Sequence, residues 1–271
     1  ITGFFVLYNI FGLKNYDNVY LYNPTNGWYN ESQYSIDSLS HLGVNCGNVF
    51  KTMRKHCVSN TGTWSTKNNA PMGILFDKNT NKCILFEIES NNSWSYEIGD
   101  FCESISLHLS GPTFTENGWI KLLKPNEKFQ SISATISFGN SIDEVLKEIT
   151  IYRRHIAHHS SIDKKLPIIF NEYMFGSWNC PSDETAHLYA PLAKKAGSDY
   201  YVIDCGWHDD IVDPFYYVGK WKESSNKYPN GLKNTLDYVR SLGLKVGLWL
   251  EPEAVGAFGN ASNNYPEEEF F

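Results

Sequence analysis

The sequence contains no apolar run that approaches the roughly 20 residues needed to span a bilayer as a helix. It also lacks an excess of basic residues, because 23 lysines and arginines stand against 30 aspartates and glutamates, a formal net charge of −7 at pH 7. A nucleic acid or an anionic membrane surface would require a basic face. We therefore expect no membrane span and no binding to nucleic acid or to a membrane.

Cysteine is scarce and widely spaced. The six cysteines form no Cys-x-x-Cys pair and lack the dense spacing of a secreted disulfide scaffold, so we expect most of them to be buried free thiols. This leaves the compartment open, with the cytoplasm slightly favoured.

Metal-ligating residues are also sparse. His155, His158 and His159 have the i, i+3, i+4 spacing of ligands on one helix face, but a basic, partly exposed connecting helix explains them without a metal. Cys46 and the His-Cys pair at residues 56–57 are too isolated for a zinc site. We expect no metal and no cofactor.

Aromatic residues are abundant, with 8 Trp, 17 Tyr and 16 Phe, and 42% of the 271 residues are hydrophobic. Such a chain can bury a substantial core in one large domain or two small ones. Aromatic rings also stack on the apolar faces of pyranose sugars, although we expect most of these rings in the core.

The character of the chain changes between residues 140 and 165. Before this point, short β-prone runs at residues 73–76, 83–89, 105–109 and 132–137 are separated by turns rich in Asn, Gly, Ser and Lys. This spacing predicts an antiparallel sandwich domain over residues 1–140.

A helix is predicted to follow. Ser141 precedes an acidic residue three positions later, as in a capping box, and Val145, Ile149, Tyr152 and Ile156 continue at helical spacing. We expect residues 141–164 to form a linker helix between two domains.

The second half alternates between strands and helices. Strands are predicted at residues 167–173, 200–204 and 245–250, and helices at residues 183–197 and 230–243, each closed by glycine. This alternation implies parallel pairing through right-handed crossovers. Three βα units are too few to close an eight-stranded barrel, which takes about 250 residues.

Two of these strands end abruptly in carboxylates, a tryptophan and a backbone breaker. Residues 200–207 read Tyr-Tyr-Val-Ile-Asp-Cys-Gly-Trp, and residues 245–253 read Lys-Val-Gly-Leu-Trp-Leu-Glu-Pro-Glu. Ordinary buried strands followed by acidic loops would look similar. Two such strands in succession favour barrel strands whose carboxyl ends open into a sugar site.

Four motifs stand in register along this half: Asp-Cys-Gly-Trp at 204–207, Gly-Lys-Trp at 219–221, Tyr-Pro-Asn-Gly-Leu-Lys at 228–233, and the run at 243–253. Together they resemble glycoside hydrolase family 36, which consists chiefly of α-galactosidases. The resemblance covers residues 165–256, and residues 71–137 resemble more weakly the β-supersandwich that precedes the barrel in that family.

The resemblance implies a multidomain fold, with an antiparallel β-supersandwich followed by a truncated (β/α)8 TIM barrel over residues 165–271. It implies an α-galactoside oligosaccharide or glycoconjugate as substrate, and a homo-oligomeric full-length protein. The expected chemistry is retaining hydrolysis, which needs two carboxyl groups about 5–5.5 Å apart. The family's nucleophile lies in a Lys-x-Asp motif on the fourth strand and its acid/base lies later. Neither motif is present, so we expect both catalytic residues beyond Phe271 and an inactive isolated chain.

The resemblance also implies part of a sugar-binding pocket. Asp204 matches an aspartate that accepts hydrogen bonds from galactose hydroxyls, although a loop or helix-capping carboxylate is the alternative. Trp249 matches a tryptophan of the sugar subsite, or it packs the core. Trp207 and Trp221 belong to matched motifs and serve either structure or sugar contact.

Further candidates lie near these motifs. We expect one of Glu251 and Glu253 to face the pocket and the other to hold a neighbouring loop. Asn171 and Trp178 lie either at the pocket rim or in a surface loop. Asp209 and Asp210 are expected in a solvated loop.

Two residues depart from the family pattern. Cys205 occupies the place of a second aspartate in many members, and a thiol replaces a charged double acceptor poorly. This departure questions strict α-galactosyl specificity, although Cys205 remains a candidate substrate-binding residue. Lys220 stands where an acidic residue is common, and its expected effect is local.

Three functions remain open from the sequence. The chain is part of an α-galactosidase, part of a transferase of the same superfamily that moves galactose onto another sugar, or a non-catalytic carbohydrate-binding or vestigial domain that has lost its chemistry. A Lys-x-Asp motif downstream in the reading frame would favour the enzymes.

Overall fold

The computed structural model describes residues 5–8, 16–27, 29–44, 54–101, 104–208, 218–219, 221–252 and 256. Their contacts divide the chain into two compact units, Ile1–Ala157 and His158–Phe271. The candidates Cys46, Asp209, Asp210, Lys220 and Glu253 lie outside the described residues. The linker and domain boundaries expected at residues 141–164 stay a prediction.

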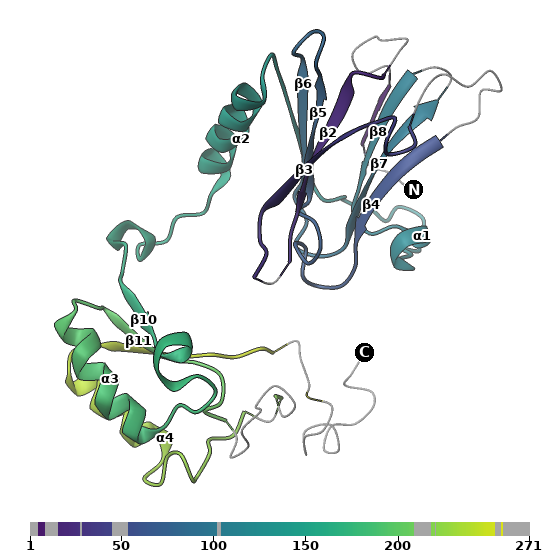
Figure 1. The fold of residues 1–271 in the computed structure, drawn as a ribbon. Coiled ribbons are helices and arrows are strands. Elements are labelled where there is room, and N and C mark those ends of the chain that lie inside the picture. The colour runs from purple at the N-terminus through teal and green to yellow at the C-terminus, as the bar shows by residue number, and fades with distance from the viewer. Residues whose placement is uncertain are drawn as a thin grey trace. The chain divides into compact units, whose positions relative to one another are not determined.

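The first unit contains two antiparallel sheets (Figure 1). One has the order β1-β8-β7-β4, with β1 (Phe5–Tyr8), β4 (Arg54–Asn60), β7 (Trp94–Phe101) and β8 (Ser104–Ser110). The other has the order β3-β2-β5-β6-β9, with β2 (Val19–Thr25), β3 (Gln33–Ser38), β5 (Met72–Asp77), β6 (Cys83–Ile88) and β9 (Ala134–Gly139). The four runs predicted from sequence correspond to β5, β6, β8 and β9.

The two sheets share one hydrophobic core. Leu21, Leu75 and Phe86 come from the five-stranded sheet and pack in the same cluster as Tyr96 and Leu107 of the other sheet. Successive residues of a strand point to opposite faces, so Ile74 and Leu85, which neighbour Leu75 and Phe86, pack in a different cluster. The buried Tyr96 hydroxyl donates to the side-chain oxygen of Asn23 at 3.0 Å, which satisfies a polar group inside the core.

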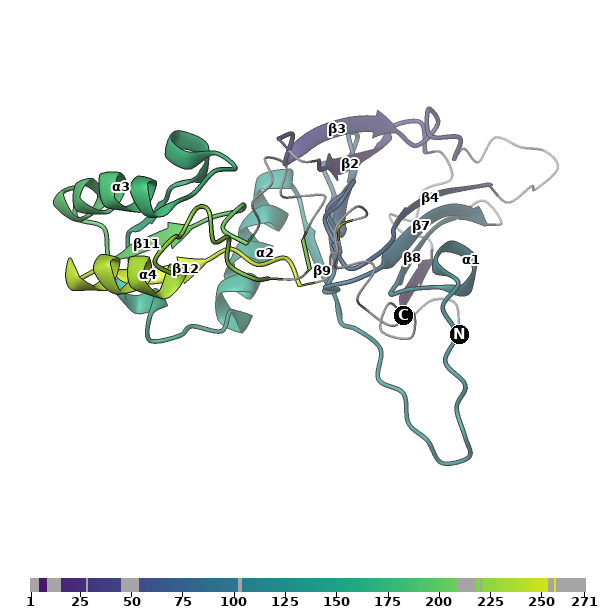
Figure 2. The same ribbon diagram turned by 90° about the horizontal axis from the view of Figure 1, so that it is seen from below.

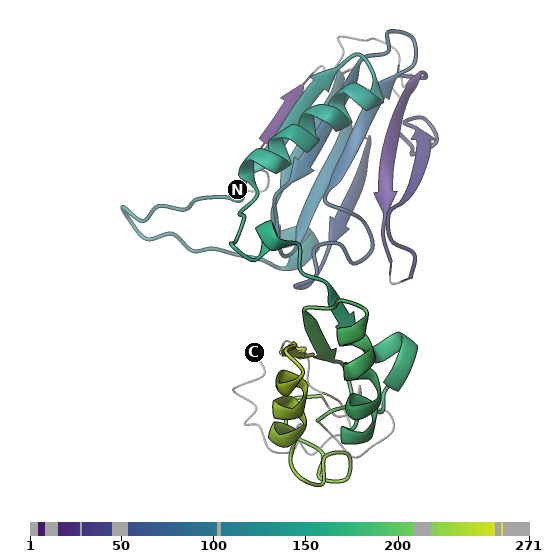
Figure 3. The ribbon, with the colours of Figure 1, turned by 90° about the vertical axis from the view of Figure 1, so that its left-hand side faces the viewer.

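Helix α2 (Ile142–Ile156) packs on the outer face of the five-stranded sheet (Figure 3). Val145 and Ile149 are buried in a second cluster with Leu85 of β6. The Ser141 hydroxyl accepts a hydrogen bond from the Glu144 amide, as predicted. The Glu144 carboxylate, however, accepts from the backbone amide of Asn140 at 2.7 Å. In a capping box it would accept from the amide of the N-cap residue, Ser141.

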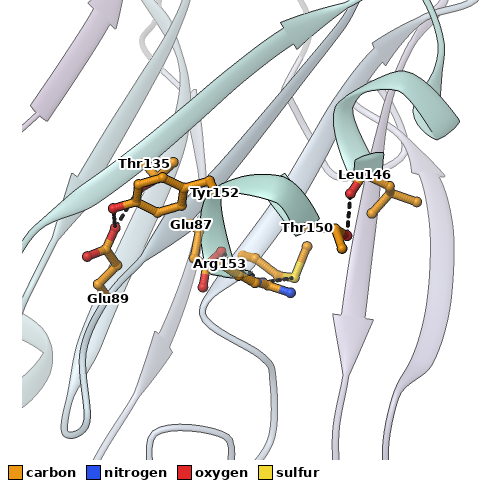
Figure 4. Close-up of polar contacts among 8 residues, drawn as sticks. Glu87, Glu89, Thr135, Leu146, Thr150, Tyr152 and Arg153 are labelled. Atoms are coloured by element: carbon orange, nitrogen blue, oxygen red, sulfur yellow. Dashed lines mark hydrogen bonds and ion pairs between the residues drawn. The ribbon is translucent and has the colours of Figure 1, made fainter. Parts of the chain in front are cut away.

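Polar contacts tie the last turns of α2 to the sheet (Figure 4). The Tyr152 hydroxyl donates to the Glu89 carboxylate at 2.7 Å, and Thr135 of β9 donates to the same oxygen. Arg153 pairs with Glu87 of β6 at 2.8 Å. Helix α2 therefore belongs to the first unit by its contacts. It ends at Ile156, so His158 and His159 lie beyond it and do not share a helix face with His155.

An irregular arm at residues 118–133 runs out between α1 (Phe114–Asn117) and β9 (Figure 2). Trp119 and Phe129 face each other across it, with ring centroids 5.5 Å apart. Lys121 and Glu127 form an ion pair at 2.9 Å. These cross-contacts hold the two sides of the arm together.

The second unit contains a three-stranded parallel sheet, β10 (Ile169–Asn171), β11 (Tyr200–Ile203) and β12 (Lys245–Leu248), in sequence order. Helices α3 (Asp183–Lys195) and α4 (Leu232–Ser241) contact each other on one face of this sheet, in the βα alternation predicted. A 3₁₀ turn, η1 (Asp163–Lys165), precedes β10. Ala186, Ala190 and Ala193 of α3 are buried, and their small side chains let the helix lie close to its neighbours.

The first strand of this unit is shorter than the predicted 167–173. After Asn171 the chain turns into a π-helical segment, η2 (Tyr173–Ser177). The carbonyl of Glu172 accepts hydrogen bonds from the amides of Gly176 and Ser177 at 3.1 and 2.8 Å, so local bonds replace the sheet ladder. The predicted closing glycines are confirmed, because Gly197 and Gly243 have φ of 91° and 76°.

Candidate functional site

The carboxyl ends of the three parallel strands meet at one edge of the sheet. Asn171 ends β10, Asp204 follows β11 and Trp249 follows β12. The amide of Trp249 donates to the carbonyl of Ile203 at 2.9 Å, which continues the ladder past β12. Residues far apart in sequence therefore converge at the edge where open parallel sheets bind ligands.

The Asp204 carboxylate is half-buried and held by two neighbours. Its Oδ2 accepts from the side-chain amide of Asn171 at 2.5 Å, and its Oδ1 accepts from the backbone amide of Cys205 at 2.7 Å. A carboxylate oxygen has two lone-pair sites, so each oxygen can accept another donor. The group is thus oriented and retains capacity for a hydroxylated ligand.

The turn after Asp204 requires glycine. Gly206 has φ of 100°, and a Cβ there would approach the carbonyl oxygen of Asn179 to 2.2 Å. Lys227 donates to the Gly206 carbonyl at 2.7 Å and supports the turn. Cys205 is only 1% exposed, so its thiol is covered by protein, and its assignment to substrate binding stays a prediction.

Three tryptophans predicted from the motifs lie together with a histidine. We call Trp207, His208, Trp221 and Trp249 the aromatic cluster. Ring centroids of Trp221 and Trp249 are 5.7 Å apart in an edge-to-face arrangement, and those of His208 and Trp221 are 4.9 Å apart. Trp221 has a φ of 45°, which is unfavourable for a bulky residue and marks a constrained backbone.

The members of the aromatic cluster differ in exposure. Trp207 is 5% exposed, and its indole Nε1 donates to the carbonyl of Trp249 at 2.9 Å. This bond and its burial favour a supporting role for Trp207. Trp249 and Trp221 are half-buried and present part of their surface at the strand ends. His208 is buried and was not predicted, because nothing in its sequence position separates it from a loop residue.

Glu172 is a second residue that the sequence analysis missed. It is fully buried, and its Oε2 accepts from the Tyr201 hydroxyl at 2.6 Å and from the Thr185 hydroxyl at 3.3 Å. Burial raises the pKa of the Glu172 carboxyl to about 7, against the lowering effect of those two hydrogen bonds, and the charge of Asp204 raises it further. The available signal was an acidic residue close to the end of an apolar run, with only Asn171 between them, whereas Asp204 follows its run directly.

The remaining candidates lie around this edge. Glu251 is half-buried two residues after Trp249. Asn171, expected at the rim or in a surface loop, contacts Asp204. Trp178 is exposed and stacks on Tyr173, with centroids 5.2 Å apart.

A hollow of about 550 Å³ lies elsewhere, at the start of α3, with Asp183, His187 and Lys227 among its lining residues. None of the predicted sugar-site residues lines it. Within the described residues, no group of three His, Cys, Asp or Glu side chains is placed to hold a metal ion. No helix in the same part of the chain is long and apolar enough to cross a membrane.

The Melibiase family model matches residues 128–268, more than half of the 271 residues. The chain belongs to the Melibiase family. α-Galactosidase Mel36A of Lactobacillus acidophilus is 28% identical over 149 residues, which are 54% of this chain and 20% of that protein. α-Galactosidase 1 of Pediococcus pentosaceus is 35% identical over 149 residues, with the same coverage. The chain spans about one fifth of the length of these relatives.

Solved structures of this family share the fold. The α-galactosidase AgaA of Geobacillus stearothermophilus, of glycoside hydrolase family 36, superposes with a TM-score of 0.77 at 20% identity, over 97% of this chain and 34% of that one. A variant of AgaA in complex with raffinose gives a TM-score of 0.76 at 18% identity, with the same coverage. The predicted resemblance to glycoside hydrolase family 36 is confirmed.

Proposed function

We propose that this chain supplies the galactose-binding part of a retaining glycoside hydrolase that acts on terminal α-galactosyl bonds. The observation that carries the proposal is the Asp204 carboxylate, oriented by Asn171 and Cys205 at the carboxyl ends of parallel strands. The aromatic cluster beside this edge supports it, because galactose combines hydroxyl groups with an apolar face. Substrates of this kind are α-galactoside oligosaccharides or glycoconjugates.

The same proposal includes the architecture of the whole protein. The three parallel strands begin a (β/α)8 barrel over residues 165–271, and the two antiparallel sheets form the β-supersandwich over residues 1–140. We propose that the nucleophile and the acid/base belong to later barrel strands, because this chain has no Lys-x-Asp motif. We propose that the whole protein is a homo-oligomer.

The proposal predicts sugar recognition that depends on Asp204. In an enzyme that contains this segment, Asp204→Ala should lower kcat/KM for an aryl α-galactoside by about 10- to 150-fold, because a hydrogen bond to a charged group is worth about 1.5–3 kcal/mol. Asp237→Ala on the exposed face of α4 is the matched control and should leave kcat/KM unchanged.

Two outcomes distinguish a sugar-binding role of Asp204 from a structural one. A kcat/KM within about twofold of wild type in Asp204→Ala, an effect of about 0.4 kcal/mol, would make Asp204 a structural loop residue. A normal kcat/KM for Asp237→Ala together with a large loss for Asp204→Ala supports the proposed site.

A further inference from the structure

Glu172 is a buried acid next to Asn171 of the proposed sugar site, and no predicted motif gave it a role. It is fully buried in the second unit. Its Oε1 has no hydrogen-bond partner among the described residues, while Oε2 has two. A buried carboxyl group costs free energy unless its surroundings stabilise it, so its presence calls for a physical account.

The side chain of Glu172 connects three elements. It follows β10, its Oε2 accepts from Tyr201 of β11 at 2.6 Å, and the same oxygen accepts from Thr185 of α3 at 3.3 Å. The Glu172 amide donates to the carbonyl of Val202 at 3.2 Å, which is the last bond of the β10–β11 ladder. The end of β10 is therefore fixed to both the next strand and the next helix.

The adjacent residue makes the contact with Asp204. Asn171 is exposed where β10 ends, whereas Glu172, the next residue, is buried. Asn171 Oδ1 accepts from the Tyr173 amide at 2.9 Å, and its Nδ2 donates to Asp204 Oδ2 at 2.5 Å. Both ends of the Asn171 amide are thus engaged, and its orientation depends on the backbone at Glu172.

We propose that Glu172 is a positioning residue for Asp204, which acts by fixing the end of β10 so that the Asn171 amide holds one oxygen of the Asp204 carboxylate. Its value for sugar recognition rests on the proposed function. The positioning itself rests on the hydrogen bonds from Tyr201 and Thr185 and on the Asn171–Asp204 contact.

The charge of Glu172 should influence the hydrogen bond between Asn171 and Asp204 near neutral pH. Burial is the largest cause that raises the pKa of Glu172, Tyr201 and Tyr228. The charge of Asp204 raises the pKa of Glu172 further, and Glu172 raises the pKa of both tyrosines further. Ionisation of Glu172 strengthens its bonds with Tyr201 and Thr185 and increases its repulsion with Asp204. Asn171 precedes Glu172 in the chain and donates to Asp204, so its side-chain amide should report the change.

The test is a pH titration of the full 271-residue chain by NMR, following the Glu172 Cδ and the Asn171 side-chain amide. In wild type, the Asn171 signal should move with the same midpoint as Glu172. In Glu172→Gln, whose carbonyl still accepts from Tyr201, that inflection should disappear while the amide keeps its hydrogen-bonded shift. In Tyr201→Phe, the midpoint should rise because a bond to the charged form is lost.

A stronger variant and a control complete the experiment. Glu172→Met removes the acceptors and should accelerate hydrogen exchange of the Asn171 side-chain amide by at least about tenfold, the change that a loss of about 1.4 kcal/mol produces. Glu184→Gln, an exposed carboxylate on α3, should change neither signal. An Asn171 signal that ignores the Glu172 titration, or that is unchanged in folded Glu172→Met, overturns the positioning role.

Kinetics in an enzyme that contains this segment separate this inference from the proposed function. A shared midpoint in the wild-type chain, together with a kcat/KM for an aryl α-galactoside that Asp204→Ala leaves unchanged, supports the positioning and contradicts the proposed function. A large loss of kcat/KM in Asp204→Ala but none in Glu172→Met, with an undisturbed Asn171 amide, overturns the positioning and leaves the proposed function intact.

Discussion

At the scale of single residues, the site depends on how each polar group is partnered. Asp204 has two donors and open capacity, whereas Cys205 is 1% exposed beside it. The family pattern suggests that an aspartate at 205 would restore a second sugar-binding carboxylate. Because the thiol is covered by protein, we expect an aspartate at this position to destabilise the fold instead, since an ionised carboxylate would have to be desolvated there.

We therefore expect Cys205→Asp to lower the free energy of unfolding by several kcal/mol, more than Cys205→Ala, which removes only one buried sulfur. Urea unfolding of both variants measures the difference. Equal stability of Cys205→Asp and wild type would show that residue 205 reaches solvent or ligand, and would favour a direct sugar contact.

The buried Glu172 predicts a defined pH dependence of stability. Its pKa is about 7 in the folded protein against an ordinary value of 4.5, so between these pH values the folded state holds a proton that the unfolded state has released. Stability from this group is fully present below about pH 4.5 and is lost as pH rises through about 7. A difference of this size corresponds to about 3 kcal/mol at most.

Glu172→Gln removes this titration. The free energy of unfolding of Glu172→Gln minus that of wild type should therefore be greater at pH 8 than at pH 4. The increase in this difference should reach up to about 3 kcal/mol, measured by urea unfolding of both proteins at both pH values. A constant difference between the two proteins across this range would mean that Glu172 titrates normally.

At the scale of elements, α2 shows how one helix can be both amphipathic and firmly docked. Ile149 is 1% exposed in the cluster with β5 and β6, whereas Ile151 is 50% exposed on the same helix. The two residues have the same chemistry and differ only in burial.

Ile149→Ala should therefore destabilise the first unit by about 2–5 kcal/mol, and Ile151→Ala should change stability by about 0.5 kcal/mol or less. Thermal unfolding of the matched pair measures the contrast. Equal losses for the two variants would show that α2 does not dock on the sheet as described.

At the scale of the whole molecule, the proposed function places only part of a site in this chain, which lacks the Lys-x-Asp motif expected for the nucleophile. Retaining hydrolysis needs two carboxyl groups about 5–5.5 Å apart on opposite sides of the bond. We expect the pure 271-residue chain to hydrolyse an aryl α-galactoside no faster than background. Turnover that Asp204→Asn abolishes would contradict this prediction and would require a new assignment of the carboxylates.

Much of the architecture was predictable because local patterns set it. The continuous apolar runs of β5 and β6 between turn residues, the glycines after α3 and α4, and the βα alternation of the second half each reflect short-range geometry. The prediction was weaker at the end of β10, because the π-helical turn there depends on bonds to the Glu172 carbonyl that no periodicity reveals.

The sequence by itself determined the family, the strands that carry the proposed site, and the places of Asp204 and Trp249 at the strand ends, because these motifs are contiguous in the chain. Only the tertiary structure decided that Asn171 holds Asp204, that Trp207 donates to the carbonyl of Trp249, and that Glu172 is buried and bonded to Tyr201. These contacts join residues separated by 33 and 42 positions in Asn171–Asp204 and Trp207–Trp249. Such pairs meet because parallel strands bring their carboxyl ends to one edge, and the direction and burial of each side chain there depend on packing from several elements at once.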